Sequence, residues 1–131
     1  MKTDRATRSS WDRVKLCSEQ YIPLSIPRSF SYDEYARIAK GYIPRTMEDR
    51  WFIFLEGTTV FMHSSRMGTC IYYFELRALA THVVMETVFA NRDPRQYANT
   101  KADYDIEHVI FLIDWFLLGK EVPFPQLWSP E

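Results

Sequence analysis

The sequence predicts an α+β protein: a four-stranded antiparallel meander packed on a long C-terminal helix, with a short helix before the sheet. Two observations predict this fold. From Trp51 onward, apolar residues recur at every second position, which is typical of strands with one buried face. From Asp103 to Leu118 they recur at helical spacing, and Gly119 follows as a stop. We therefore expect the sheet in the middle of the chain and the long helix after it.

A short helix is expected between Ser31 and Gly41. Ser31, followed three residues later by Glu34, forms a capping box, and Gly41 can adopt the left-handed conformation that ends a helix. Pro23 and Pro27 exclude a helix just before it and favour an extended chain along the surface.

A tight hairpin is expected from "WFIFLE" (51–56) and "TVFMHS" (59–64), which are separated by two residues including Gly57. This turn would place Phe52 opposite His63 on one face of the sheet. The other face is more uniformly apolar and is the expected core face, with Trp51, Ile53, Leu55, Val60 and Met62.

Two further strands complete the expected meander. "TCIYYFELR" (69–77) alternates between two faces, and "THVVMETVFA" (81–90) is rich in β-branched residues until Pro94 interrupts the pattern. The expected helix after them begins at a capping signal in residues 100–103 and has one apolar stripe, formed by Ile106, Val109, Ile110, Ile113, Phe116 and Leu117.

The length of 131 residues suits one domain, expected over residues 21–131, preceded by a flexible, locally basic arm over residues 1–20. The aromatic share of 16% is high. Such a domain either packs many large rings or presents them to a ligand.

The overall charge and hydropathy exclude several function classes. A net charge of -1 gives no general attraction to nucleic acid, so no nucleic-acid partner is expected. The longest apolar run, residues 109–118, contains Asp114 and is too short to span a bilayer, so no membrane partner is expected. Cys17 and Cys70 match no metal-ligand spacing. We expect reduced thiols, a cytoplasmic protein, and neither a metal nor a cofactor.

The first candidate site is the acidic pair Glu48 and Asp49, directly before the first strand of the hairpin. Adjacent carboxylates can act as a general acid or base, or can help to bind a hard cation. The alternative is that they are a solvated lead-in to the strand.

The second candidate site is the loop "HSSRMG", residues 63–68. His63 could act as a base, Arg66 could bind phosphate, and Gly68 would let a ligand approach the backbone closely. Ser65 lacks the flanking glycines of a nucleophile elbow. The alternative is that His63 is a structural hydrogen-bonding group in a strand.

The third candidate site is "NRDPRQY", residues 91–97. Asn91 and Asp93 can turn the chain at a strand end, whereas Arg92 and Arg95 offer guanidinium groups suited to phosphate. The alternative, a capped turn before Pro94, accounts for Asn91 and Asp93 but not for the arginines.

These motifs resemble a family of small, uncharacterised microbial proteins that share an acidic "MED" before a tryptophan strand, an "HRSWTG"-like loop and an "NRD" turn. The resemblance spans roughly residues 42–120. The family has no established activity, and the occurrence of its relatives near ADP-ribose-processing genes leads us to expect an ADP-ribose-like ligand. The resemblance supports as family positions Glu48, Asp49, Trp51, His63, Ser65, Gly68, Asn91, Arg92 and Asp93. The chain departs from the pattern at Ser64, Arg66 and Met67, which argues against an intact catalytic site.

If the three strand ends converge, they form one rim of carboxylates, an imidazole and guanidinium groups beside aromatic rings. That mixture suits a nucleotide or another phosphate-containing ligand. In an enzyme, Glu48 or Asp49 would activate water and His63 would protonate a leaving group, with Arg66 and Arg92 holding phosphate and Trp51 against the base. Binding without turnover is the other form of this hypothesis.

The alternative function is a protein-interaction module, an inhibitor or a subunit of a larger assembly, with an aromatic and arginine surface patch.

Overall fold

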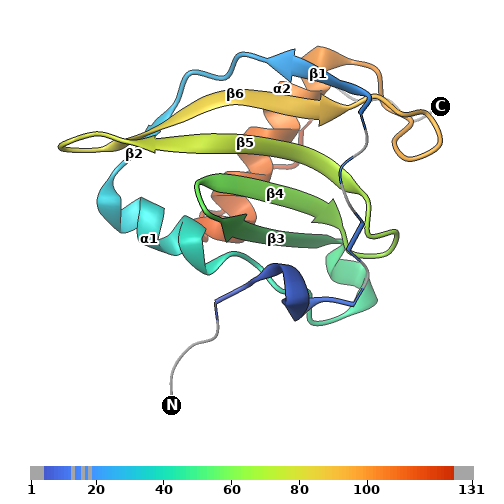
Figure 1. Cartoon of the computed structure of the whole chain (residues 1–131), viewed down its shortest axis with the longest axis horizontal. Helices are drawn as coiled ribbons and strands as arrows, with labels where there is room; N and C mark the ends of the chain where they lie inside the picture. Colours follow the sequence, from blue (N-terminus) through green and yellow to red (C-terminus); the bar gives the residue numbers. More distant parts are fainter. Residues whose placement is uncertain (1–4, 13, 16, 18, 126–131) are drawn as a thin grey trace.

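The α+β class and the antiparallel sheet are confirmed, and Figure 1 shows helix α2 crossing behind the strands. The computed structural model describes residues 5–12, 14–15, 17 and 19–125. Its elements in chain order are η1 (Arg8–Ser10), β1 (Tyr21–Leu24), β2 (Ser29–Phe30), α1 (Tyr32–Lys40), η2 (Met47–Asp49), β3 (Trp51–Glu56), β4 (Thr59–Ser64), β5 (Cys70–Ala78), β6 (Val83–Asn91), α2 (Ala102–Phe111) and η3 (Leu112–Leu117).

The sheet is wider than predicted. Strands β3 to β6 form the expected meander, but β1 and β2 both pair with β6 and extend the order to β1-β6-β5-β4-β3. The prediction of four strands was therefore wrong. Pro23 lies opposite Phe89 on the outermost strand, where a missing N–H removes no bond from the interior of the sheet. Proline excluded a helix here, as expected, but it did not prevent edge pairing.

The register of the β3–β4 hairpin is confirmed. Phe52 pairs with His63 and Phe54 with Phe61, and Gly57 has a φ of 63° in the turn. Because side chains alternate between faces, this register gives the sheet two distinct sides. Trp51 lies on the side that faces α2, whereas His63 lies on the opposite side, which is called the open face below.

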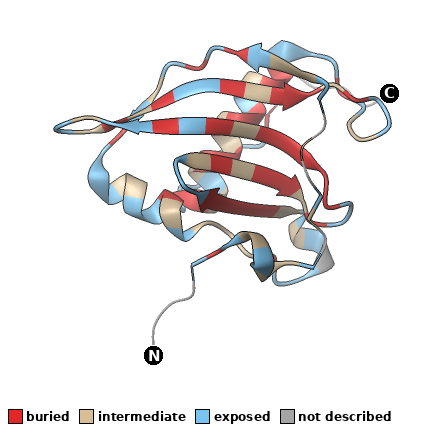
Figure 2. Cartoon of the chain, in the orientation of Figure 1, coloured by how far each residue is buried: buried red, intermediate tan, exposed pale blue. Residues whose placement is uncertain are grey.

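The main core lies between the sheet and the two helices. Alternate residues of β3, β4 and β5 point into it, and Figure 2 shows these buried positions along the central strands. Fully buried examples are Ile53, Val60, Met62, Tyr72, Phe74, Leu112 and Ile113. The face that the alternation pattern predicts as core is therefore the face that α2 covers.

Both predicted helices form, and the second covers almost the expected residues, but its 16 residues make a short helix rather than the long one predicted. In α1, the Ser31 hydroxyl accepts from the Glu34 N–H at 3.0 Å and the Glu34 carboxylate accepts from the Ser31 N–H at 3.0 Å. The C-terminal helix has ten α-helical residues and then six in the π-helical segment η3. It begins after Lys101, inside the expected segment 100–103, but the Lys101 side chain makes no cap bond, so the expected side-chain cap does not form.

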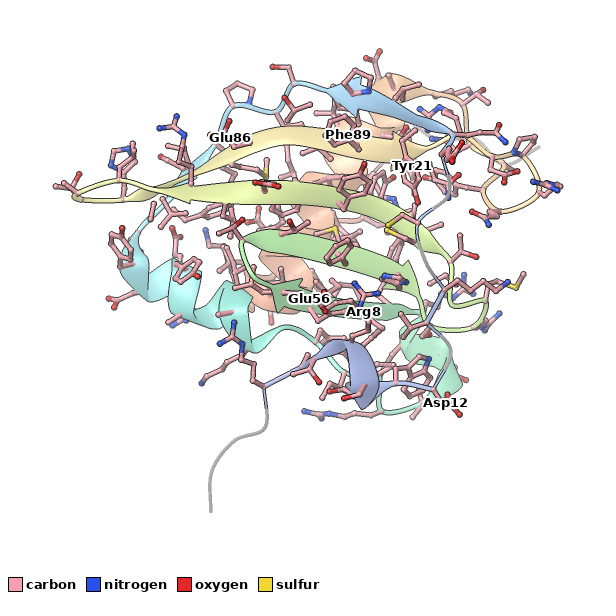
Figure 3. All side chains as sticks on the ribbon, in the orientation of Figure 1. Arg8, Asp12, Tyr21, Glu56, Glu86 and Phe89 are labelled. Atoms are coloured by element: carbon pink, nitrogen blue, oxygen red, sulfur yellow. The ribbon has the colours of Figure 1, made fainter. Side chains whose placement is uncertain are left out.

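Part of the expected N-terminal arm lies against the open face. Ala6 is fully buried there, and the Arg8 guanidinium stacks over Phe54 and Phe61 at 5.1 and 5.2 Å. Arg8 also forms an ion pair with Glu56 at 3.0 Å, and Figure 3 shows these two side chains in front of the lower strands. The division into a flexible arm (1–20) and one domain (21–131) stays a prediction, and residues 1–4, 13, 16, 18 and 126–131 lie outside the described residues.

Within the described residues, no helix has both the length and the apolar character needed to cross a bilayer. Cys17 and Cys70 are both free thiols, as expected. The cytoplasmic location stays a prediction.

Gly41 gives a test of the fold at the point where α1 leads back toward β3. Its φ is 70°, and an added Cβ would lie 2.3 Å from the Ile53 carbonyl oxygen and 2.7 Å from Ala6 Cβ. We expect Gly41→Ala to lower the free energy of unfolding in urea, because it adds both left-handed strain and a clash with backbone.

Gly57→Ala is the matched control, since Gly57 has a similar φ of 63° but nothing within 4 Å of the new Cβ. Gly41→Ala should cost about 1–3 kcal/mol more than this control, which is the usual penalty of overpacking. Equal losses in the two variants would show that the close approach of Gly41 to Ile53 does not constrain the fold.

Candidate functional site

A half-open cleft of about 310 Å³ lies where β3 begins and β4 ends, beside α2. Two cationic side chains and five rings line it: Arg50, Arg66, Trp51, Tyr97, Tyr104, His108 and Phe124. Ser64 and Gln96 add polar groups. The cleft therefore joins positive charge with aromatic surface, the combination that the sequence leads us to expect at a strand-end rim.

Short local structures place the two arginines at the cleft. Arg50 follows η2 in the left-handed conformation, with a φ of 68°, and leads directly into β3. Its carbonyl accepts from the Ser65 N–H at 2.8 Å, which ties the start of β3 to the β4–β5 loop. Arg66 is the next residue of that loop. The Ser65–Arg50 hydrogen bond therefore holds the backbones of the two arginines close together.

The wall of the cleft rests on a buried carboxylate, that of Asp105 in α2. Asp105 is fully buried and forms an ion pair with Arg92, which follows β6. Its other oxygen accepts from the Tyr72 hydroxyl at 2.7 Å, from the Tyr97 hydroxyl at 3.0 Å and from Asn99 Nδ2 at 2.9 Å. The guanidinium and the amide can only donate, and both hydroxyls are able to donate, so the two carboxylate oxygens serve as acceptors in this network.

His108 connects this buried network to the cleft. Its Nδ1 lies 2.9 Å from the Tyr72 hydroxyl, and its ring packs against Trp51 at 5.2 Å and Tyr104 at 4.9 Å between centroids. Burial lowers the pKa of His108 from 6.5 to about 4. The imidazole is therefore neutral at physiological pH, and it lines the cleft as an uncharged polar group.

Two of the residues expected at the site line the cleft, and a third supports it. Trp51 and Arg66 are cleft residues, as the convergence of strand ends predicts. Arg92 lies behind the wall, where its guanidinium pairs with Asp105 and also donates to the Asn91 carbonyl at 2.9 Å. Arg92 is thus committed to the scaffold, whereas the sequence suggested that it binds phosphate.

The three expected catalytic residues do not share a cleft. His63 is fully buried on the open face, stacked on Phe54 at 5.5 Å, and its Nδ1–H donates to the Gly68 carbonyl at 2.9 Å. The Arg45 N–H donates to the Asp49 carboxylate at 2.6 Å and holds the pKa of Asp49 below its ordinary value. Glu48 is exposed in η2. The structure does not bring these three residues together, and their combined catalytic role stays a prediction.

The other expected ligand-binding residues shape the loops around the cleft. Asn91 Nδ2 donates to the Cys70 carbonyl at 2.9 Å, while its Oδ1 accepts from the Asp93 N–H at 2.7 Å. The Gly68 N–H closes the β4–β5 loop on the Ser64 carbonyl at 2.8 Å, and Ser65 is fully buried. For Asn91 and Asp93, the geometry is that of the capped-turn alternative.

Sequence reasoning missed Asp105 and His108 as site residues. The signal for both lies in the helix pattern. Stepping back four residues from Val109 gives Asp105, and stepping back four from Leu112 gives His108. Both polar residues thus continue the buried row of α2, where an unpaired polar side chain would be costly. An acid and a histidine in a buried row indicate an internal network rather than a solvated helix face.

Comparison with known protein families, curated proteins and solved structures found no match. The resemblance to a microbial family rests on its three short motifs. Within the described part of the chain, no three histidine, cysteine or acidic side chains come together as a metal site requires.

His108 predicts how stability depends on pH. The folded state resists protonation until about pH 4, whereas the unfolded chain takes up the proton near pH 6.5, so protonation favours unfolding between these values. Relative to His108→Asn, the native protein should lose about 2–3 kcal/mol of unfolding free energy as pH falls through this window.

Urea unfolding of both proteins above pH 6.5 and near pH 4 checks this prediction. His108→Asn is suitable because the amide nitrogen can take the place of Nδ1 beside Tyr72 without titrating. The carboxylates are common to both proteins and cancel in the comparison. Parallel pH profiles for the two proteins would contradict the assignment of a buried, neutral His108.

Proposed function

We propose that the cleft binds a small ligand that combines a flat ring with a phosphate group, which is the chemistry of a nucleotide. The observation that carries the proposal is the placement of Arg50 and Arg66 beside Trp51, Tyr104 and Phe124 in one half-open cleft. Guanidinium groups bind phosphate through paired, charge-assisted hydrogen bonds, and aromatic rings stack on a base.

The charge of the cleft supports an anionic ligand. The Arg50 guanidinium forms no ion pair or hydrogen bond with another described residue, and both Arg50 and Arg66 are exposed. The acidic group of this network is Asp105. Arg92 neutralises its charge, and the Tyr72 and Tyr97 hydroxyls donate hydrogen bonds to it. The cleft thus offers positive charge on the outside and uncharged hydrogen-bonding groups inside.

The size of the cleft favours a mononucleotide. A volume of about 310 Å³ is at the lower end of small-molecule sites, which span about 300–1,000 Å³. A ligand as large as ADP-ribose would therefore fill the cleft with one part and project into solvent with the other. Binding without turnover is the form proposed, because Glu48, Asp49 and His63 do not meet in the cleft.

The alternative function, a protein-interaction module, would use the open face. Half-buried rings follow one another there, with Tyr21 against Tyr73 at 5.2 Å and Tyr73 against Phe89 at 5.1 Å; Figure 3 labels Tyr21 and Phe89 at this part of the sheet. Arg8, which stacks on Phe54 and Phe61 of this face, is already paired with Glu56, whereas the Arg50 guanidinium forms no ion pair with another described residue. We therefore assign the small-ligand function to the cleft and leave the ring row as the rival surface.

The proposal predicts a ligand-dependent rise in melting temperature. AMP, ADP, ADP-ribose and inorganic phosphate are each added at millimolar concentration, and a ligand at a hundredfold excess over its Kd stabilises by about 2.7 kcal/mol. We expect a rise with at least one nucleotide and a smaller rise with inorganic phosphate alone, which lacks the stacking ring.

Arg50→Gln combined with Arg66→Gln should weaken nucleotide binding at least about tenfold, because each removes a charged hydrogen-bonding group. Arg77→Gln is the matched control, since Arg77 is an exposed arginine on β5 that pairs with Glu86 and lies outside the cleft. No shift with any nucleotide, or an equal shift in the double variant and the native protein, would overturn the proposal.

A further inference from the structure

We propose that His108 decides which ligands the cleft accepts: its Nε2 acts as a fixed hydrogen-bond acceptor, so the ligand must offer an N–H or O–H group at that point. The inference rests on the proposed function, since it concerns the same cleft. It follows from the placement of protons in the network of Asp105, Tyr72 and His108, and not from the rings and arginines that carry the binding proposal.

The Asp105 carboxylate fixes the direction of the Tyr72 proton. A carboxylate that is paired with a guanidinium, as Asp105 is with Arg92, accepts hydrogen bonds and does not donate them, and the Tyr72 oxygen lies 2.7 Å from Asp105 Oδ1. At that distance, two oxygens with no proton between them would repel. Burial also raises the pKa of Tyr72 well above its ordinary value, so the hydroxyl keeps its proton. Tyr72 therefore donates to Asp105.

The direction of the Tyr72 proton then fixes the tautomer of His108. A tyrosine hydroxyl has a single proton, and here it is used on Asp105. The Tyr97 hydroxyl also lies 2.9 Å from the Tyr72 oxygen, but Tyr97 donates its own proton to Asp105. Toward His108 Nδ1, at 2.9 Å, the Tyr72 oxygen can therefore only accept. Nδ1 must therefore carry the hydrogen, and in a neutral ring the lone pair lies on Nε2.

The remaining ring nitrogen is available to a ligand. His108 lines the cleft, and among the described residues its hydrogen-bond partner is the Tyr72 hydroxyl, at Nδ1. Trp51 meets the imidazole edge-on at an interplanar angle of 73°, and Tyr104 packs on it from one turn earlier in α2. The ring is thus held between neighbours, so the direction of the Nε2 lone pair is set before a ligand arrives.

A preset acceptor gives selectivity through the cost of leaving it unpaired. A ligand that covers Nε2 without donating to it removes water and supplies nothing in return. We expect such a ligand to bind about tenfold more weakly than a matched ligand with a donor. The donor could come from an amine of the base or from a hydroxyl of the sugar, and ligand pairs distinguish these two sources.

The first experiment needs no ligand. Side-chain ¹⁵N NMR of the native protein reports which imidazole nitrogen carries the hydrogen, and the signals of His108 are assigned by their loss in His108→Asn. We expect the Nδ1–H tautomer at neutral pH. Observation of the Nε2–H tautomer in the native protein would overturn the inference, whatever the cleft binds.

Two variants test the cause of the tautomer. Tyr72→Phe removes the acceptor at Nδ1, and Asp105→Asn allows an amide to donate to Tyr72, which would reverse the Tyr72 proton. In either folded variant, the population of the Nε2–H tautomer should rise. If one variant does not fold, the other decides; an unchanged Nδ1–H tautomer in a folded variant would overturn the assigned relay.

The second experiment measures selectivity. AMP is compared with three analogues that each lack one of its donors. Purine riboside 5′-monophosphate lacks the amine, 2′-deoxy-AMP lacks the 2′-hydroxyl, and 3′-deoxy-AMP lacks the 3′-hydroxyl. The native protein should favour AMP about tenfold over one of the three. In His108→Asn, which can keep a donor to Tyr72 but has no atom at Nε2, that preference should vanish.

Equal binding of all four ligands by the native protein, or a preference that persists in His108→Asn, would overturn the selectivity. A complete absence of nucleotide binding would overturn the proposed function and the selectivity with it, while the tautomer would still be decided by NMR. The two failures are therefore distinguishable.

Discussion

The buried ion pair between Asp105 and Arg92 is the interaction on which the cleft depends. Asp105 belongs to α2, Arg92 follows β6, and Tyr72 reaches the same carboxylate from β5, so one charge joins the helix to two strands. A buried carboxylate costs several kcal/mol unless its lone pairs are matched by donors. The donors and the helix are therefore fixed in position together, and the wall of the cleft is a single unit with the core.

The register of the β3–β4 hairpin could be predicted because two local constraints agree. A two-residue turn at Gly57 sets the pairing, and a one-residue slip would turn every apolar side chain of the core face outward. The edge strands could not be predicted in this way. Tyr21 pairs with Asn91, which lies far along the chain. The local pattern around Pro23 does not indicate which strand this segment pairs with. Local alternation predicts strands, whereas the width of a sheet depends on distant pairing.

The site was predictable where strand ends converge and unpredictable where the helix supplies polar groups. Trp51 and Arg66 were expected at a rim and lie in the cleft. His63 was expected there too, although the same alternation that places Trp51 toward α2 places His63 on the other face. The face of the sheet on which a side chain lies therefore decides whether it reaches the cleft, even for residues that are close to the cleft in sequence. Asp105 and His108 were hidden because the apolar residues around them made the helix look purely structural.

The N-terminal segment makes hydrogen bonds to the β4–β5 loop, and these bonds affect how far the chain can be shortened. Trp11 Nε1 donates to the Ser65 carbonyl at 2.7 Å, and the Lys15 N–H donates to the Gly68 carbonyl at 2.8 Å. These bonds hold the β4–β5 loop from the open face. The same loop places Arg66 at the cleft on the other side of the sheet. A chain trimmed to residues 21–131 would keep the sheet and both main helices but lose the back support of one cleft wall. The segment that looks most dispensable in the sequence therefore supports the wall of the cleft.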